Sequence, residues 1–175
     1  VAFLAEQGRQ KGFELRVVDL MDAGDEHVSS TRIRNLLTAG DGRETARLLG
    51  RPHFGTGRVV EGARRGRTIG IPTANLDVPA ELAVPARGVY AGWMTVDQAE
   101  YPAVTNVGLR PTFEGEPVTT VEAHLLDFSG DLYGRQVRLN FVERLREEKK
   151  FDGVEALVAQ IQQDIQRGRE LLAQG

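Results

Sequence analysis

The sequence contains no cysteine at any of its 175 positions. Disulfide bridges, thiolate nucleophiles and thiolate zinc sites are therefore excluded. Its three histidines, His27, His53 and His124, are too widely separated to form a zinc-binding motif. No apolar run is long enough to cross a bilayer, and Val1 to Gln10 lacks the basic region and cleavage site of a secretory signal. We therefore expect a cytoplasmic protein with no membrane partner.

Lysine is scarce as well, with three residues among 22 basic ones, and the formal net charge is −3. A chain built mainly to hold nucleic acid would carry a basic excess, so no nucleic-acid partner is expected. Arginine suits forked contacts with phosphate, although a composition bias is the simpler explanation. The length and the 41% hydrophobic content suit one well-packed domain plus a smaller piece.

The first fifty residues alternate short helical and strand patterns. Together they form a piece too small to bury a core of its own, and we interpret it as the last part of an α/β domain. The patterns predict a helix opening at Val1, a short buried strand over Leu15–Leu20, a helix from Ser29 or Ser30 to Thr38 ended by Gly40, and a helix over Glu44–Leu49 stopped by Gly50 and Pro52.

After Pro52 the chain becomes rich in valine, threonine, aromatic residues and glycine. Many short strands without helices between them predict an antiparallel barrel or sandwich. An apolar stripe from Val154 to Leu172 predicts a final helix packed on it, with Asp152 and Glu155 as a capping box. The expected strands are Gly57–Glu61, Gly88–Val96, Ala103–Val107, Thr119–Asp127 and Gln136–Phe141.

The segment from Gly62 to Asn75 alternates glycine with arginine. Glycines let backbone N–H groups approach an anion, and arginines neutralise its charge. The segment lacks the Gly-Lys-Ser/Thr ending of a Walker A loop and the strand–helix surroundings of a dinucleotide fingerprint. A phosphate site and a plain basic hairpin loop therefore both stay open. The residues concerned are Gly62, Arg64, Arg65, Gly66, Arg67 and Gly70.

Three further positions carry side chains suited to phosphoryl transfer. Thr73 and Asn75 stand two apart, so an extended backbone points both oxygens to one side, as hard ligands for magnesium. Glu122 alternates with the apolar Val121 and Ala123 and shares its face with His124, where a carboxylate can accept a hydroxyl proton. Thr73 and Asn75 could equally be ordinary residues of a turn or strand edge. For Glu122 the pattern alone favours an ordinary solvent-facing glutamate.

Two other stretches complete the pattern. Thr105–Phe113 ends a strand in a turn with glycine, proline, arginine and an aromatic residue, which suits a lid over a planar ligand or a simple loop. Leu145–Phe151 is a charged run of the kind that usually forms a solvated face.

Taken together and in this order, these stretches resemble the riboflavin kinase family from Gly50 to the C-terminus. The resemblance implies a mainly β fold: a Greek-key antiparallel six-stranded β-barrel with a C-terminal α-helix, here preceded by the short α/β remnant. Its most specific parts are Gly70–Asn75, Val121–His124, Asp131–Gly134, and Leu145 and Arg146 with Phe151.

The resemblance also implies roles for individual residues. Glu122 matches the general base that deprotonates the terminal ribityl hydroxyl, and Thr73 and Asn75 match the residues that hold magnesium and the ATP phosphates. The full implied ATP site is Gly62, Arg64, Gly66, Arg67, Gly70, Pro72, Thr73, Asn75, His124, Asp127 and Phe128. The implied flavin site is Asn106, Gly108, Arg110, Thr112, Arg146 and Phe151.

The implied activity is that of an ATP:riboflavin 5′-phosphotransferase that converts riboflavin and ATP to FMN and ADP with Mg²⁺, a step of FMN and FAD biosynthesis. Two alternatives remain: a barrel that binds flavin or nucleotide without turnover, and a fragment that only docks to another domain.

Val28–Arg34 resembles the closing motif of the nucleotidyltransferase domain of bacterial bifunctional FAD synthetases. We therefore expect residues 1–49 to be the C-terminal remnant of that domain and residues 50–175 to form the kinase domain. No FMN adenylyltransferase activity is expected from this chain.

Overall fold

The computed structural model describes the chain except for residues 20, 21, 24, 25, 63, 64, 80, 111–116 and 175. It forms two compact units, Val1–Ser30 and Thr31–Gly175. None of the helices in the described residues is long and apolar enough to cross a membrane.

The first unit contains the helix α1 (Ala2–Lys11), which ends at Gly12, and the paired two-residue strands β1 (Asp22–Ala23) and β2 (Glu26–His27). The buried strand predicted from Leu15 is wrong over its described residues, which form neither helix nor strand. Val17 and Val18 there are 58% and 80% exposed. A short apolar run becomes a buried strand only beside strands that pair with it, and β1 and β2 pair with each other.

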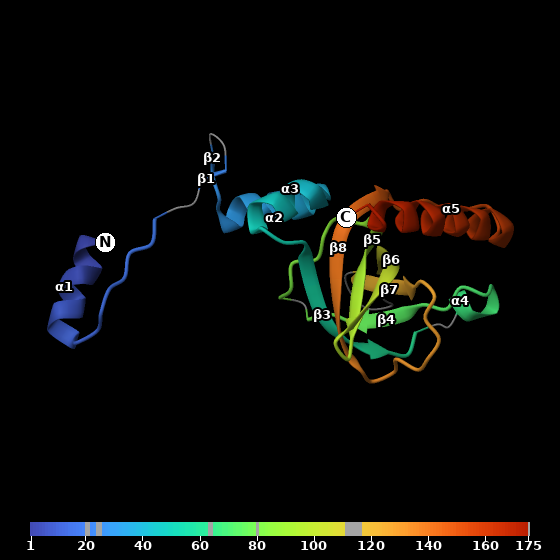
Figure 1. Cartoon of the computed structure of the whole chain (residues 1–175), viewed down its shortest axis with the longest axis horizontal. Helices are drawn as coiled ribbons and strands as arrows, with labels where there is room; N and C mark the ends of the chain where they lie inside the picture. The colour runs from blue at the N-terminus through green and yellow to red at the C-terminus, as the bar shows by residue number, and fades with distance from the viewer. Residues whose placement is uncertain (20–21, 24–25, 63–64, 80, 111–116, 175) are drawn as a thin grey trace. The chain divides into compact units, whose positions relative to one another are not determined.

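The second unit is built on a closed antiparallel barrel of six strands in the order β3-β4-β7-β6-β5-β8 (Figure 1). The strands β5, β6 and β7 follow one another, and β8 returns to lie beside β5, which is a Greek key. The predicted barrel is therefore confirmed. Its strands are β3 (His53–Val60), β4 (Ala74–Asp77), β5 (Gly88–Val96), β6 (Ala99–Arg110), β7 (Val118–Leu125) and β8 (Gln136–Arg146).

Side chains fill the inside of the barrel, as expected for a small barrel. Tyr90, Met94 and Leu139 are almost fully buried there. On β7 the inward face is Val121, Ala123 and Leu125, which confirms the alternation predicted from the sequence. The alternating polar residues of β7, Glu122 and His124, therefore face outward.

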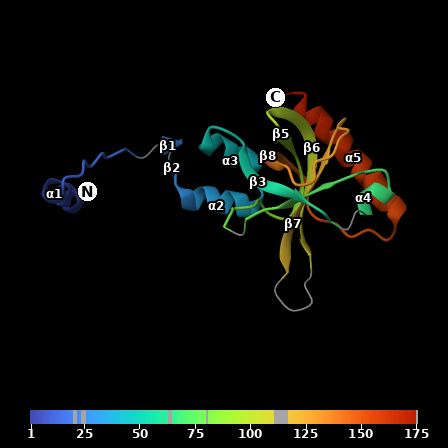
Figure 2. The ribbon, with the colours of Figure 1, turned by 90° about the horizontal axis from the view of Figure 1, so that it is seen from below.

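The helix α5 (Val154–Leu172) covers part of this outer face, as Figure 2 shows. Gly168 lets it pass close to β6, because a Cβ at this position would lie 3.0 Å from Cγ2 of Val104. The predicted capping box is wrong: Gly153 is the N-cap and no side chain bonds the helix start. With the cap at 153, Glu155 stands one position too early to complete such a box. The apolar contact comprises Val89, Ala91, Val104, Leu126, Leu145 and Leu172.

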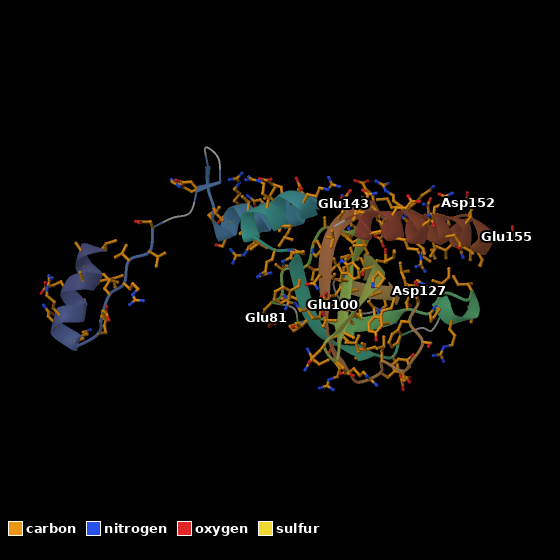
Figure 3. All side chains as sticks on the ribbon, in the orientation of Figure 1. Glu81, Glu100, Asp127, Glu143, Asp152 and Glu155 are labelled. Atoms are coloured by element: carbon orange, nitrogen blue, oxygen red, sulfur yellow. The ribbon has the colours of Figure 1, made fainter. Side chains whose placement is uncertain are left out.

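Two helices precede the barrel within the second unit. The helix α2 (Ser30–Ala39), which begins at the unit boundary, and α3 (Gly42–Leu49) match the two expected helices. The carbonyl of Leu37 accepts the N–H of Ala86 at 2.8 Å. Arg43 donates from Nε to Oε2 of Glu143 on β8 at 2.6 Å, and Figure 3 shows Glu143 close to α3. Residues 31–49 thus fold against the barrel, while the domain boundary at 49/50 stays a prediction.

Candidate active site on the outer face of the barrel

One row of side chains runs around the outside of the barrel at a single register. Asn75 of β4 pairs with Glu122 of β7, which pairs with Asn106 of β6. The row continues through Val89 of β5 to Arg146 of β8. Directly opposed residues of neighbouring strands point to the same side of a sheet. Five strands therefore place these side chains on one surface, with Glu122 between two asparagines.

A cavity of about 290 Å³, here called the Glu122 cavity, lies over this row and beneath the first half of α5. Leu157 and Ile161 of the helix form its apolar side. The structure thus brings together residues that are far apart in the sequence. Of the expected site residues, the cavity is lined by Gly66, Thr73, Asn106, Glu122, His124, Arg146 and Phe151.

A second cavity of about 370 Å³, here called the Phe128 cavity, is lined by Arg67, Pro72, Thr73 and Phe128 among others. Thr73 is the residue that the two cavities share. The edge of Tyr101 meets the ring of Phe128 at a centroid distance of 4.9 Å and an angle of 78°, which holds that ring in place. The two cavities therefore adjoin at Thr73.

The far wall of the Phe128 cavity is the loop 129–133, which sequence reasoning did not assign to a site. A turn fixes this loop, because Oδ1 of Asp131 accepts the N–H of Tyr133 at 3.0 Å. Gly134 then adopts φ +74°, a conformation that suits glycine. The sequence signal was present in Asp131–Gly134, which the family resemblance included without a role.

The glycine-rich segment folds back on itself in the short helix α4 (Arg65–Thr68). The N–H of Ile71 bonds the carbonyl of Gly66 at 2.8 Å, and Gly70 closes the turn at φ +75°. A Cβ at position 66 would overlap the carbonyl oxygen of Ile71, the residue that bonds Gly66 across the turn. The expected loop around Gly66 therefore needs glycine for its shape. Arg64, which belongs to the expected ATP site, lies outside the described residues.

Two local features surround Thr73 and Asn75. His124 donates from Nδ1 to the carbonyl of Pro72 at 2.7 Å, which ties the start of β4 to β7. Gly62 passes directly over the Asn75 amide, which a Cβ at position 62 would overlap. Asn75 lines neither cavity but is the cross-strand partner of Glu122. The structure thus places His124 in the lining of the Glu122 cavity and not in that of the Phe128 cavity.

Asp127 is exposed and lines neither cavity. Its Oδ1 accepts Nη2 of Arg169 on α5 at 2.7 Å, and this hydrogen bond lowers the pKa of Asp127 below its ordinary value. The residue therefore ties the end of β7 to α5. The structure does not bring it together with Phe128 at a nucleotide pocket, although the two are adjacent in sequence.

The expected flavin residues are only partly brought together. Gly108 lies against the carboxylate of Glu148 near Asn106. Arg110, at the exposed end of β6, lines neither cavity, and Thr112 lies outside the described residues. Asn106, Arg146 and Phe151 do meet in the Glu122 cavity.

Asp164 of α5 also lines the Glu122 cavity and was missed by sequence reasoning. It is 5% exposed and receives Arg146 in a two-pronged ion pair. The available signal was an acidic residue on the same stripe as Ile161 and Ile165, where an apolar side chain is expected.

Comparison with known proteins decides the family. The family model described as riboflavin kinase matches residues 49–172. The chain belongs to the riboflavin kinase family. It is 40% identical over 171 residues to the bifunctional riboflavin kinase/FMN adenylyltransferase of Pseudomonas fluorescens, covering 98% of this chain and 55% of that protein. Identity to the Bacillus subtilis protein of the same description is 40% over 152 residues, covering 86% and 48%. The chain spans about half the length of the curated relatives it matches.

Two solved structures share the fold of this riboflavin kinase family member. A Trypanosoma brucei riboflavin kinase superposes with a TM-score of 0.52 at 28% identity, covering 69% of this chain and 79% of that one. A Streptococcus pneumoniae protein described as a macrolide-efflux protein superposes with a TM-score of 0.82 at 37% identity, covering 94% and 54%.

Proposed function

We propose that this chain is a riboflavin kinase, which transfers the γ-phosphoryl group of ATP to the terminal ribityl hydroxyl of riboflavin and releases FMN and ADP. The observation that carries this proposal is that Thr73 lines two adjoining cavities, one of which holds Glu122. A phosphate donor in one cavity and an alcohol in the other would meet at that threonine. Membership of the riboflavin kinase family supports the same substrates.

On the donor side, the Phe128 cavity offers features suited to a nucleoside triphosphate. The ring of Phe128, held by Tyr101, gives a flat face for a purine. Arg67 carries a guanidinium that can neutralise phosphate charge. The compact turn around Gly66 brings backbone close to Thr73. We therefore assign ATP to this cavity.

The family's ATP chemistry needs a divalent metal ion, and we propose Mg²⁺ held by Thr73 and Asn75. Magnesium prefers oxygen ligands, and it usually keeps several waters and binds substrate phosphates with only one or two protein groups. A hydroxyl and an amide oxygen fit that requirement. Within the described residues no cluster of three histidine, aspartate or glutamate side chains offers an all-protein site. The bound ion would neutralise charge on the transferred phosphoryl group.

On the acceptor side, Glu122 is the proposed general base. Its side chain is half-buried between Asn75 and Asn106. Among the described residues, no hydrogen bond or ion pair engages its carboxylate. A carboxylate in a cavity can accept the proton of a bound hydroxyl while the phosphoryl group is transferred.

The length of the cavity floor favours a long alcohol. Arg146 stands three strands from Glu122 in the same register row. Three strand spacings amount to roughly 14 Å. A short alcohol at Glu122 would not reach Arg146 and Phe151, whereas a ribityl chain ending in a tricyclic ring can span from one to the other.

The experiment that tests the proposal measures ADP release as a function of added riboflavin and Mg²⁺. The wild-type chain should release ADP only when both are present. Glu122→Gln should lower kcat by ~10²–10⁴-fold, the usual contribution of a positioned base, with little change in ATP affinity. Glu100→Gln is the matched control, because Glu100 is an exposed carboxylate on β6 that lines neither cavity.

The outcomes separate the alternatives. Riboflavin binding without riboflavin-dependent ADP release would favour a non-catalytic flavin-binding barrel. Wild-type turnover by Glu122→Gln would show that another group removes the proton. The first outcome would refute the kinase activity, and the second would refute the role of Glu122 as the base.

A further inference from the structure

The helix α5 buries a carboxylate in the wall of the Glu122 cavity. Asp164 is 5% exposed, and burying a charge is costly unless it is paired and hydrogen-bonded. Its Oδ2 accepts Nε and Nη2 of Arg146 at 3.0 and 2.8 Å, and its Oδ1 accepts Nε2 of Gln160 at 3.1 Å. The carboxylate is thus satisfied on both oxygens.

Further contacts hold the Arg146 guanidinium in this orientation. Besides the two nitrogens held by Asp164, its Nη1 donates to the carbonyl of Glu147 at 2.9 Å. The guanidinium carbon lies 5.7 Å from the ring centre of Phe151, and Nζ of Lys149 lies 5.5 Å from that centre. Asp164, Arg146 and Phe151 therefore form one part of the cavity wall.

Attachment of the helix does not require this buried pair. Replacing a buried ion pair by apolar residues is often neutral for stability, because desolvation offsets much of the attraction. The apolar contact that includes Leu172 already fixes α5, and Asp127–Arg169 adds an exposed pair of the same kind. What Asp164 adds is a planar cation in one orientation beside an aromatic ring, at the end of the row that begins at Glu122.

We propose that Asp164 is a positioning residue for the acceptor. It holds the Arg146 guanidinium so that this group and Phe151 form the wall against which the planar part of the acceptor rests. The far end of the acceptor then reaches Glu122. The inference rests on the proposed riboflavin kinase activity and names a residue through which that site selects a flat, extended alcohol.

The test compares Asp164→Asn with Arg169→Gln and with the wild type. In Asp164→Asn the dissociation constant for riboflavin, followed by flavin fluorescence, should rise ~10-fold, since a charge-assisted contact that orients Arg146 is lost. The KM for riboflavin should rise with it, while the KM for ATP should change less than about 2-fold. Arg169→Gln breaks the exposed Arg–Asp pair on the same helix and should leave both constants unchanged. Asp164→Glu, which keeps the charge, should recover part of the loss.

Each result decides a separate point. A wild-type chain without riboflavin-dependent ADP release would refute the proposed function, whatever the variants do. An active wild type with unchanged riboflavin binding in Asp164→Asn would overturn the positioning role. If circular dichroism shows that Asp164→Asn does not fold, Gln160→Ala decides. That variant removes one hydrogen bond to the carboxylate and should weaken riboflavin binding ~2–3-fold without changing the KM for ATP. Unchanged binding would overturn the role.

Discussion

Gly62 illustrates how a single missing side chain shapes the proposed metal site. A Cβ at this position would overlap the Asn75 amide, which is the far end of a side chain and can swing away. Gly62→Ala should therefore fold but displace the amide oxygen. We expect kcat to fall ~10-fold and the Mg²⁺ concentration for half-maximal rate to rise, because small misplacements at a reacting centre are costly. Steady-state rates over a magnesium titration measure both.

A double-variant cycle shows whether Gly62 acts through Asn75. On an Asn75→Ala background the added methyl has no amide to displace, so Gly62→Ala should cause little further loss. Independent, multiplying losses from the two substitutions would show that the glycine acts elsewhere in the loop.

His53 provides a pH-dependent contribution to stability. Burial lowers the pKa of its imidazole below the ordinary value of 6.5, against the opposing effect of its hydrogen bond to the Ala83 carbonyl. The folded chain therefore favours the neutral ring. Its stabilising contribution is complete above pH 6.5 and is lost as the pH falls from there through the folded-state pKa.

We accordingly expect the Tm of the wild type to fall more steeply with decreasing pH than the Tm of His53→Gln. The comparison runs from about pH 7.5 to about pH 5.5, a range that brackets the ordinary histidine pKa of about 6.5. Thermal melts monitored by circular dichroism at several pH values measure the slopes. His27→Gln, at an exposed position in the first unit, is the control. Equal slopes of Tm against pH for the wild type and His53→Gln would show that His53 makes no pH-dependent contribution to stability.

At the residue scale, strand alternation was enough to predict which way some candidate side chains point. Glu122 is flanked by inward-facing Val121 and Ala123, so its outward direction could be predicted. Asp164 could not be found in this way, since its partner Arg146 is 18 positions away on another element. The family resemblance placed Asp127 in the ATP site, but its pairing with Arg169 depends on the position of α5, which local sequence does not show.

The helix α5 is the element on which the Glu122 cavity depends, and Leu172 is its buried C-terminal anchor, 7% exposed. Leu172→Ala should lower the free energy of unfolding by about 2–3 kcal/mol, as for other buried leucines. Val154→Ala, on the same helix at 61% exposure, should change it by less than about 0.5 kcal/mol. Denaturant titrations of both variants measure the difference. Equal effects would mean that the contact with the barrel does not hold the helix.

At the element scale, five of the six barrel strands were predicted, and one of them, Gly88–Val96, with its observed bounds. The strand β4 was missed because its four residues directly follow the glycine-rich segment and Pro72 and are too few to show alternation. β6 and β8 are longer than predicted. Pairing with neighbours extends a strand through charged residues such as Arg144, which local pattern does not foresee.

At the scale of the whole chain, the strand pattern predicted a barrel or sandwich with a final helix, and the family resemblance selected the barrel. They did not predict that residues 31–49 would fold against β8. The contacts concerned are a backbone hydrogen bond from Ala86 to Leu37 and an ion pair between Arg43 and Glu143, which lie 49 and 100 positions apart. Such long-range pairs leave no periodic trace in the sequence.

The threonine common to both cavities also constrains the order of events in a catalytic cycle. With one residue bordering both compartments, donor and acceptor would have to be present together, and the phosphoryl group would pass directly from one to the other. Initial-rate plots against riboflavin at several fixed ATP concentrations should therefore give intersecting lines. A single molecule joining a nucleotide to a flavin through a phosphate chain should compete with both substrates. Parallel lines would instead indicate a phosphorylated enzyme intermediate.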